Sequence, residues 1–294
     1  MRLLRLRGSL VPDASYPWPL EPFDRQHPVR AFLGDPRIGD GGGSSFHTGV
    51  DISAPDGTPV YAVAPGRVSL GGPQIVVVST PTRNFGYWHI VPAVANGVHV
   101  PLHGLLGHVA SGWGHVHFSE HTTKPSPQGA YWNPLRQGAL TPFADFGKPV
   151  VSRIVSPKTI FGVVGLEAVA LDHPPIAPPP PWDKTPVTPA LLRWRLLHDA
   201  EAVVPWRVVA DFRVSFQPHV VDASETRFGA VYAPGTRQNH PDEPGVFRYQ
   251  LARRFDTRRF PDGPYTIDVE ATDVRGNTGR RRLGVTIANA NPPV

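Results

Sequence analysis

The chain contains no cysteine among its 294 residues and only one methionine. Without thiols it can form no disulfide, bind no metal through sulfur and use no cysteine nucleophile. This absence fits a protein of the cell envelope that avoids thiol oxidation, and it fits many cytosolic proteins equally well. The absence of cysteine therefore excludes thiolate metal sites and catalysis by a cysteine nucleophile, but it does not indicate where in the cell the protein works.

Long hydrophobic runs are also absent. No apolar stretch approaches the roughly 20 residues that a membrane-spanning helix needs, so we predict no membrane span. The opening MRLLRLRGSLVPDAS has the basic residues of a signal peptide but only fragments of its apolar core, and no small-residue cleavage site follows. This pattern is compatible with a signal peptide that the chain has lost, with a wrongly assigned start of the sequence, and with another export route.

Charged residues make up only 18% of the chain, whereas proline (36) and glycine (29) are abundant. This mixture favours short strands joined by rigid turns over long helices. The length suffices for two ordinary domains. The net charge of +5 and a pI near 9.7 favour anionic partners, but the lysines and arginines are scattered without interleaved aromatics, so no nucleic acid is expected.

Turn residues and apolar runs divide the chain into three segments. Residues 1–28 are rich in proline and aromatics (YPWPLEPF) and are predicted to form an extended lead-in. Residues 29–148 alternate short apolar runs with Gly, Pro and Asp turns, which predicts an all-β catalytic domain. Within it, residues 75–78 (IVVV) are expected to form a fully buried strand. Residues 149–294 hold strand candidates at regular spacing and predict a β-sandwich.

The last segment contains two distinctive patterns. Tyr265, Ile267, Val269 and Ala271 alternate with polar residues, as in a half-buried strand, and the turn RGNTG that follows predicts a hairpin. The run PPIAPPPP (174–181) cannot pair inside a sheet. We expect a stiff loop there, serving either as a spacer or as a recognition motif.

Four of the thirteen histidines and one aspartate stand in three blocks that could form one site. His47 and Asp51 lie in FHTGVD, His89 lies in YWHI, and His115 and His117 lie in GHVHFSE. The last two are two positions apart in a β-like run, so their side chains leave the same face of a strand. Zinc accepts imidazole nitrogen and carboxylate oxygen, and a catalytic zinc needs three protein ligands and one open position. The set therefore predicts a metal site.

These blocks resemble those of the lysostaphin-type (LytM-like) zinc endopeptidases. FHTGVDISAPDGTPVYAVAPGRV is similar to the first metal-ligand block of the family and FGYWHIVPAV to its Tyr-x-His-Leu block, with Ile90 in place of leucine. GLLGHVASGWGHVHFSE is similar to the closing Gly-x-His-x-His-Phe block. The resemblance implies a LytM-like antiparallel β-sheet domain. A generic similarity of YTIDVEATDVRGNTG to bacterial immunoglobulin-like modules implies an immunoglobulin-like sandwich in residues 149–294.

The resemblance also implies a role for each candidate residue. His47, Asp51 and His117 would bind Zn²⁺, His115 would act as general base, and His89 would polarise the scissile carbonyl or stabilise the oxyanion. The implied activity is hydrolysis of peptide cross-links or stem peptides of bacterial peptidoglycan, in the cell envelope or after secretion. The C-terminal domain could bind the wall or a protein partner.

Other functions fit these residues less well. A catalytically silent wall-binding protein, or an activator of another cell-wall hydrolase, would typically have lost one or more ligands, and a structural adhesin would leave the histidines unexplained. Trp113 could narrow the groove and stack on substrate, or cover the core as a rim residue. Residues 39–45 (GDGGGSS) are expected to form a loop at the rim, and residues 1–28 could pack across the groove.

Overall fold

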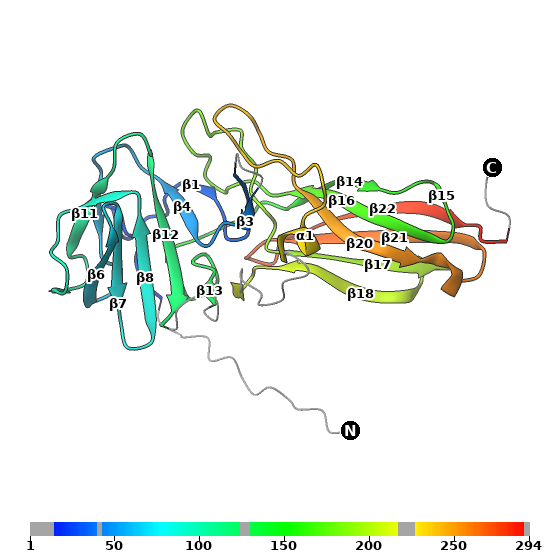
Figure 1. Cartoon of the computed structure of the whole chain (residues 1–294), viewed down its shortest axis with the longest axis horizontal. Coiled ribbons are helices and arrows are strands. Elements are labelled where there is room, and N and C mark those ends of the chain that lie inside the picture. The colour runs from blue at the N-terminus through cyan, green and yellow to red at the C-terminus, as the bar shows by residue number, and fades with distance from the viewer. Residues whose placement is uncertain (1–14, 40–42, 124–129, 217–226, 291–294) are drawn as a thin grey trace, which may run out of the picture.

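The computed structural model describes residues 15–39, 43–123, 130–216 and 227–290. It is an elongated molecule built almost entirely from β-strands, which form two neighbouring regions along its long axis (Figure 1). The described residues contain one short α-helix, α1 (Arg227–Val231), and one 3₁₀ turn, Thr257–Arg259. The predicted all-β fold class is confirmed. No helix in the described ranges is long and apolar enough to cross a membrane.

The N-terminal region is organised around strand β12 (His115–Thr122), which carries two of the predicted site residues. It pairs antiparallel with β4 (Val50–Ser53) on one side and with β8 (Arg83–Trp88) on the other. The main sheet follows the order β1-β4-β12-β8-β7-β6-β10. Its remaining strands are β1 (Val29–Ala31), β6 (Gly66–Gly72), β7 (Ile75–Ser79) and β10 (His99–Val100). Two smaller sheets comprise β5 (Pro59–Tyr61), β9 (Ile90–Pro92) and β11 (Leu105–Val109), and the pair β2 (Pro36–Ile38) and β3 (Ser44–Phe46).

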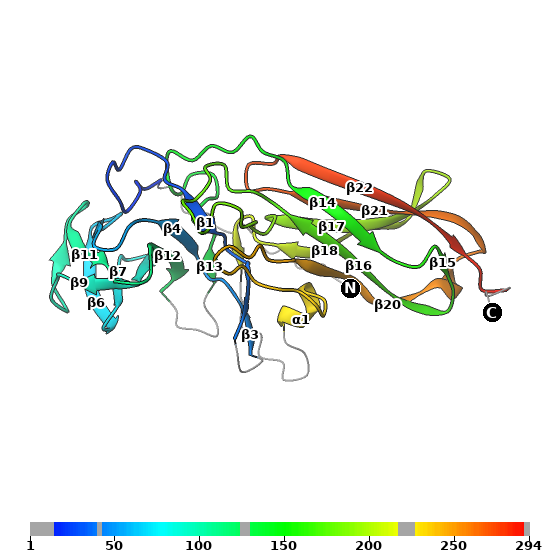
Figure 2. The same cartoon turned by 90° about the horizontal axis from the view of Figure 1, so that it is seen from above.

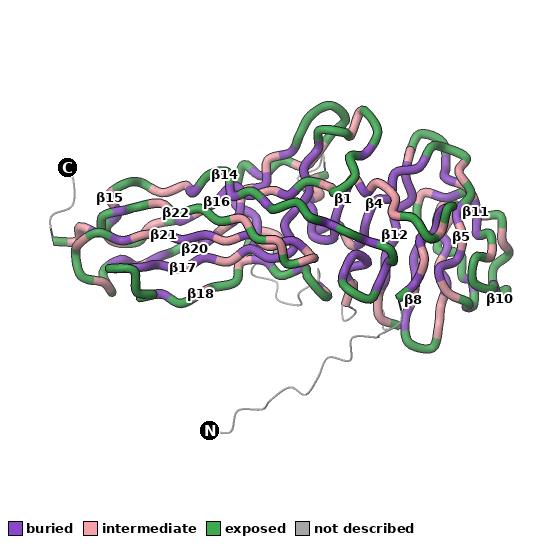
Figure 3. The backbone as a smooth tube through the Cα atoms, turned by 180° about the vertical axis from the view of Figure 1, so that it is seen from behind, coloured by how far each residue is buried: buried purple, intermediate pink, exposed green. Residues whose placement is uncertain are grey.

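Apolar residues on one face of this sheet form the first core. In β7, Val76 and Val78 are fully buried, whereas Ile75 and Val77 are partly exposed. The expectation of a fully buried strand at residues 75–78 is therefore wrong, because only one face of β7 packs against the core. Buried segments, purple in Figure 3, run through both regions of the molecule.

Part of the predicted lead-in also belongs to this core. Tyr16, Trp18 and Leu20 are at most 4% exposed and pack in the same cluster as the strands. The Tyr16 hydroxyl donates to the buried carboxylate of Glu120 on β12. Tyr16, Trp18 and Leu20 thus contribute apolar area to the core, and the boundary predicted at residue 28 does not coincide with an edge of it. Residues 1–14 lie outside the described part of the chain.

The C-terminal region consists of two sheets that share a second core. One sheet contains β14 (Val150–Val155), β16 (Val163–Leu171) and β20 (Arg248–Asp256). The other follows the order β15-β22-β21-β17-β18, with bounds Thr159–Ile160, Thr278–Ile287, Gly263–Thr272, Leu191–His198 and Glu201–Asp211. Trp194 of β17 and Phe255 of β20 are in edge-to-face contact across the interface, with ring centroids 5.7 Å apart. This packing of two sheets agrees with the predicted β-sandwich. An immunoglobulin-like connectivity of its strands stays a prediction.

The predicted hairpin near the end of the chain is confirmed. Strands β21 and β22 pair antiparallel from Gly263 opposite Ile287 to Thr272 opposite Thr278. The apolar set at 265, 267, 269 and 271 is buried, as its alternation predicts. Asp268, on the other face, is also fully buried, because Arg195 and Arg280 lie over its carboxylate.

The two regions are joined by more than one connection. Strand β13 (Tyr131–Trp132) pairs with β12 on one side and with β19 (Ser215–Phe216), from the C-terminal half of the chain, on the other. α1 lies beside β3, as Figure 2 shows. Two long loops, residues 173–190 and 232–247, extend from the sandwich toward the N-terminal region at the top of Figure 1. These loops bring C-terminal residues to the predicted site.

Candidate metal centre

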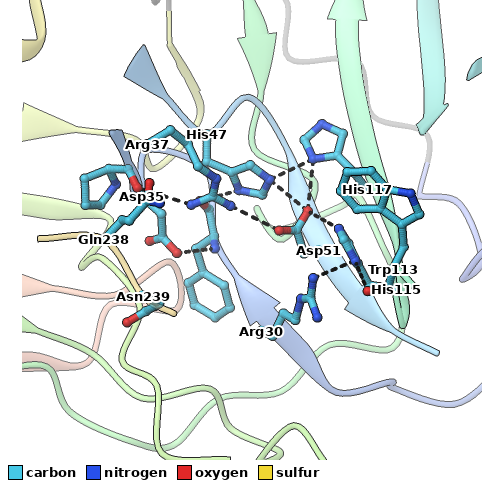
Figure 4. A network of polar contacts seen from close by, with 12 residues as sticks. Arg30, Asp35, Arg37, His47, Asp51, Trp113, His115, His117, Gln238 and Asn239 are labelled. Atoms are coloured by element: carbon cyan, nitrogen blue, oxygen red, sulfur yellow. Dashed lines mark hydrogen bonds and ion pairs between the residues drawn. The ribbon is translucent and has the colours of Figure 1, made fainter. Parts of the chain in front are cut away.

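Three of the predicted site residues converge on one point beside β4 and β12 (Figure 4). Nε2 of His47 lies 2.9 Å from Oδ1 of Asp51 and 2.7 Å from Nδ1 of His117. Nδ1 of His117 lies 3.0 Å from the same carboxylate oxygen. All three residues are less than 9% exposed.

The three converging atoms suit a metal ion. Ligands bound about 2.0–2.1 Å from a tetrahedral zinc lie roughly 3.3 Å from one another, only slightly more than the 2.7–3.0 Å separations of His47, Asp51 and His117. Two imidazole nitrogens and one carboxylate oxygen also form a donor set that zinc accepts. These residues could therefore hold a metal ion.

Strand register and one glycine produce this convergence. His117 on β12 stands directly opposite Asp51 on β4. A Cβ on Gly49, between His47 and Asp51, would lie 2.2 Å from the carbonyl oxygen of Phe118, so no side chain fits there. Because the two chain segments approach this closely, the side-chain ligand atoms of Asp51 and His117 come within 3.0 Å of each other.

Hydrogen bonds fix the orientation of two candidate ligands. Nδ1–H of His47 donates to the carbonyl oxygen of Phe32 at 2.9 Å, which leaves Nε2 unprotonated toward the centre. Oδ2 of Asp51 accepts from Nη2 of Arg37 at 3.1 Å, which leaves Oδ1 for the centre. Burial and the charge of Arg37 lower the pKa of His47 to about 3. Burial acts to raise the pKa of Asp51, but its interactions with His47 and His115 hold it well below the ordinary value. The aspartate is thus an anion and His47 is neutral, as metal binding requires.

His115 and His89 lie beside these three residues. Nε2 of His115 is 3.5 Å from Oδ1 of Asp51, so the ring faces the same centre. The His89 ring lies 4.7 Å from that of His115 and stacks on Trp113, with ring centroids 3.6 Å apart. Burial, followed by repulsion from His115 and His117, lowers the pKa of His89 to about 3. His89 is therefore neutral at physiological pH.

The tautomer of His115 depends on two competing partners. Its Nδ1 lies 2.8 Å from the carbonyl oxygen of Trp113 and 2.7 Å from Nη2 of Arg30. A carbonyl only accepts and a guanidinium only donates, so these contacts are alternatives that select different tautomers. With the proton on Nδ1 the ring donates to Trp113, and Nε2 is free to accept a proton at the centre.

A short loop presents Trp113 at the edge of the centre. Backbone N–H groups of Gly112 and Gly114, on either side of it, donate to the Asp56 carboxylate at 2.7 and 2.9 Å. Gly114 has φ +60°, a conformation that favours glycine. Trp113 is 40% exposed. Trp113 thus stacks on His89 and lines the cavity, while a role in stacking on substrate stays a prediction.

All five predicted site residues, the four histidines and Asp51, border a cavity of about 280 Å³. The opposite wall of this cavity comes from the C-terminal region. Trp182, Gln238, Asn239 and His240 line it together with Arg30 and Arg37 of the N-terminal region. Gln238 is held in place because its Oε1 accepts from the backbone N–H of Ile38 at 2.6 Å. A second cavity of about 780 Å³ adjoins the first and shares Arg30, Trp113 and Trp182 with it. Together the cavities form a groove between the two regions.

The sequence indicated only one side of this groove. All five predicted residues line the cavity, and the lining residues from the C-terminal region were not predicted. The only available signal was a tryptophan directly after the polyproline run. No residue from 15–28 lines either cavity among the described residues. Residues 40–42, at the middle of the predicted rim loop, lie outside the described part of the chain.

The chain has neighbours among solved protein structures. No family model matches the chain, and no curated protein matches it. Among solved structures, Helicobacter pylori Csd3 is 21% identical over 37% of this chain with a TM-score of 0.27. A candidate M23 peptidase from Pseudomonas aeruginosa is 25% identical over 36% of it with a TM-score of 0.23. The chain spans 30% and 48% of the lengths of these two proteins. Murine CRIg is 15% identical over 49% of this chain, with all of CRIg covered and a TM-score of 0.22.

Proposed function

We propose that the protein is a zinc-dependent endopeptidase that hydrolyses peptide cross-links or stem peptides of bacterial peptidoglycan, in the cell envelope or after secretion. The observation that supports this most strongly is the convergence of Nε2 of His47, Oδ1 of Asp51 and Nδ1 of His117 in a groove that also holds the two predicted auxiliary histidines. Three protein ligands with an accessible fourth position are the arrangement of a catalytic zinc. The choice of peptidoglycan follows from the sequence resemblance.

His47, Asp51 and His117 would hold the zinc. When bound, zinc acts as a Lewis acid and lowers the pKa of a water molecule to about 7. His115 is the general base in this proposal. With its Nδ1 proton donated to the Trp113 carbonyl, Nε2 accepts the proton of the attacking water. The same proton then passes to the amide nitrogen that leaves, so the products are an amine and a carboxylate.

His89 stabilises the oxyanion in this proposal. Its low pKa keeps the imidazole neutral, and a neutral ring can still donate one N–H to the developing negative charge. Stacking on Trp113 restricts the orientation of the ring, which provides the preorganisation that such a donor needs. The two cavities together leave room for an extended peptide beside Trp113 and Trp182.

The test compares the wild type with three variants, His117→Ala, His115→Ala and His99→Ala. Zinc content is measured by mass spectrometry after dialysis, and activity by release of new amino groups from purified peptidoglycan. His117→Ala is expected to lose both zinc and activity. His115→Ala is expected to keep zinc and lose activity, because Nε2 of His115 takes the proton. His99, exposed on β10, is the matched control and should change neither.

A second arm distinguishes the enzyme from a silent wall-binding protein. Chelation should abolish hydrolysis, and added zinc should restore it. A wild type that binds zinc and sediments with peptidoglycan but releases no amino groups would favour the silent protein. A wild type that takes up no zinc would overturn the proposal.

A further inference from the structure

A second group of acidic side chains lies away from the histidine centre, where the sandwich meets the N-terminal region. Asp145 precedes β14, Asp172 follows β16 directly, and Asp273 follows β21 directly. One oxygen of each carboxylate lies within 4.8 Å of one oxygen of the other two. Two oxygens that both bind a calcium ion at about 2.4 Å can be at most about 4.8 Å apart. The three groups are thus close enough to share one ion.

Burial and unmet hydrogen bonding distinguish this cluster from ordinary acidic groups. The three aspartates are 4%, 2% and 2% exposed. Oδ2 of Asp145 and Oδ2 of Asp172 are buried and have no hydrogen-bond partner among the described residues. A buried carboxylate oxygen without a partner destabilises the folded state unless a cation or donor reaches it. Two such oxygens in one cluster therefore point to a ligand.

The protein supplies one positive charge near these groups. Arg275 follows Asp273 by two residues, and its Nε and Nη2 both donate to the carbonyl oxygen of Phe143. Asp273 accepts from the backbone N–H groups of Arg275 and Asn277 and from Nδ2 of Asn277. Three carboxylates and one guanidinium carry a formal charge of two negatives, which one divalent cation balances.

We propose that Asp145, Asp172 and Asp273 form a calcium site at the junction of the two regions. All the side-chain donors are oxygens, which suits a hard cation and not the zinc of the histidine centre. Backbone carbonyl groups and water would complete the six to eight ligands that calcium takes. Three carboxylates held this close together repel one another when no cation lies between them.

The position of Asp172 gives the site a structural consequence. Its backbone N–H donates to the carbonyl of Val187 at 2.7 Å, and the N–H of Val187 donates back at 2.9 Å. This pair closes the base of the loop that carries Trp182 into the groove. Calcium bound to Asp172 would therefore fix that base to Asp145 and to the β21–β22 hairpin. The site is independent of the proposed peptidase activity.

The test uses the full-length protein after removal of metals with a chelator. Calcium chloride is titrated by calorimetry, and the melting temperature is recorded with and without calcium. The wild type is expected to bind one calcium ion per chain and to melt at a higher temperature when loaded. Asp172→Asn and Asp145→Asn should each weaken calcium binding at least tenfold. His117→Ala is the control for the other site and should bind calcium like the wild type.

The alternative is a cluster that holds a shared proton and no ion. Without calcium, Asp172→Asn should melt at or above the wild-type temperature, because it removes one buried negative charge while preserving shape. If that variant does not fold, Asp145→Asn carries the test. No uptake by the wild type at about 10 mM calcium, above the range of weak extracellular sites, would overturn the site, as would uptake unchanged by both substitutions. An equal response to magnesium chloride would overturn the calcium assignment.

Discussion

Trp182 lies over the guanidinium of Arg30, whose Cζ is 4.2 Å from the centre of the indole ring. Arg30 belongs to β1 of the N-terminal region and contacts His115, whereas Trp182 belongs to a loop of the C-terminal region. The contact therefore joins the second wall of the groove to the immediate surroundings of the candidate general base.

Trp182→Ala should weaken substrate binding without loss of metal. The substitution removes a half-buried aromatic surface from the groove, and one stacking contact is worth about 1 kcal/mol. KM for soluble cross-linked peptides should rise about fivefold, while kcat and zinc content stay unchanged. Steady-state kinetics and metal analysis check this.

Trp206→Ala is the matched control for that prediction. Trp206 is also half-buried beside arginines, with Cζ of Arg193 4.6 Å from its ring centre, but it lies on β18 and lines neither cavity of the groove. KM should not change in this variant. Faster hydrolysis by Trp182→Ala would show that the loop obstructs the groove and would contradict the prediction.

Gly49→Ala should disrupt the metal centre through the backbone. The new Cβ would meet the carbonyl oxygen of Phe118 at 2.2 Å, so β4 and β12 must separate. We expect a loss of about 2–3 kcal/mol in the free energy of unfolding and a zinc affinity at least about tenfold lower, since Asp51 and His117 move apart. Gly284→Ala on β22 is the control, because nothing lies within 4 Å of its Cβ. Equal zinc affinity in both variants would contradict the prediction.

His89→Ala should lower kcat with little effect on zinc content. If His89 donates to the oxyanion, its removal should reduce kcat about 10²–10³-fold. The pKa of about 3 also implies that His89 stays neutral across the working pH range, so it should not produce the acidic limb of the pH–rate profile. Comparison of kcat and of the pH–rate profiles for the wild type and His89→Ala, with His99→Ala as the control, checks both points. A variant with full kcat would exclude His89 from the reaction.

Asp268→Asn should make the free energy of unfolding less dependent on pH in the acidic range. Burial acts to raise the pKa of Asp268, but hydrogen bonds from Arg280 and Arg195 lower it below the ordinary value. The folded state thus binds this proton less readily than the unfolded state. The resulting stability is complete above the unfolded pKa near 4 and is lost as pH falls through the folded value.

The measurement for Asp268 is urea unfolding at pH 7, 5 and 3. The substitution should cost about 3 kcal/mol at pH 7, because the arginines lose a buried anion, and the difference from the wild type should shrink at pH 3. Asp211→Asn is the control: its partner Arg213 is exposed, so the cost should stay below about 1 kcal/mol. A cost for Asp268→Asn that does not vary with pH would contradict the assignment.

Local patterns predicted the N-terminal half of the centre well. Alternation places His115 and His117 on one face of a strand. This inference needs only the geometry of a single strand. The pairing of β12 with β4, which brings His117 opposite Asp51, has no local signal in the sequence; the family resemblance implies only that the two residues share a metal.

The second wall of the groove, the acidic cluster and the packing of the lead-in depend on contacts between distant parts of the chain. Trp182 and Gln238 reach the centre through loops whose course is set by packing between the two regions. The aspartates at 145, 172 and 273 are unremarkable in the sequence, because each stands alone beside a strand or turn. Tyr16 and Trp18 fall in the predicted extended lead-in, because the proline-rich context hides the apolar area that they bury.

Strand β13 forms backbone hydrogen bonds with β12 and with β19, so the main sheet continues into the C-terminal half of the chain. This continuity limits how the protein can be recombined. A chimera that transfers only residues 29–148 to another scaffold would inherit the histidines and the aspartate but leave an unpaired sheet edge and an open-sided groove. Engineering a new specificity is therefore better attempted by exchanging the two loops at residues 173–190 and 232–247 on the intact chain.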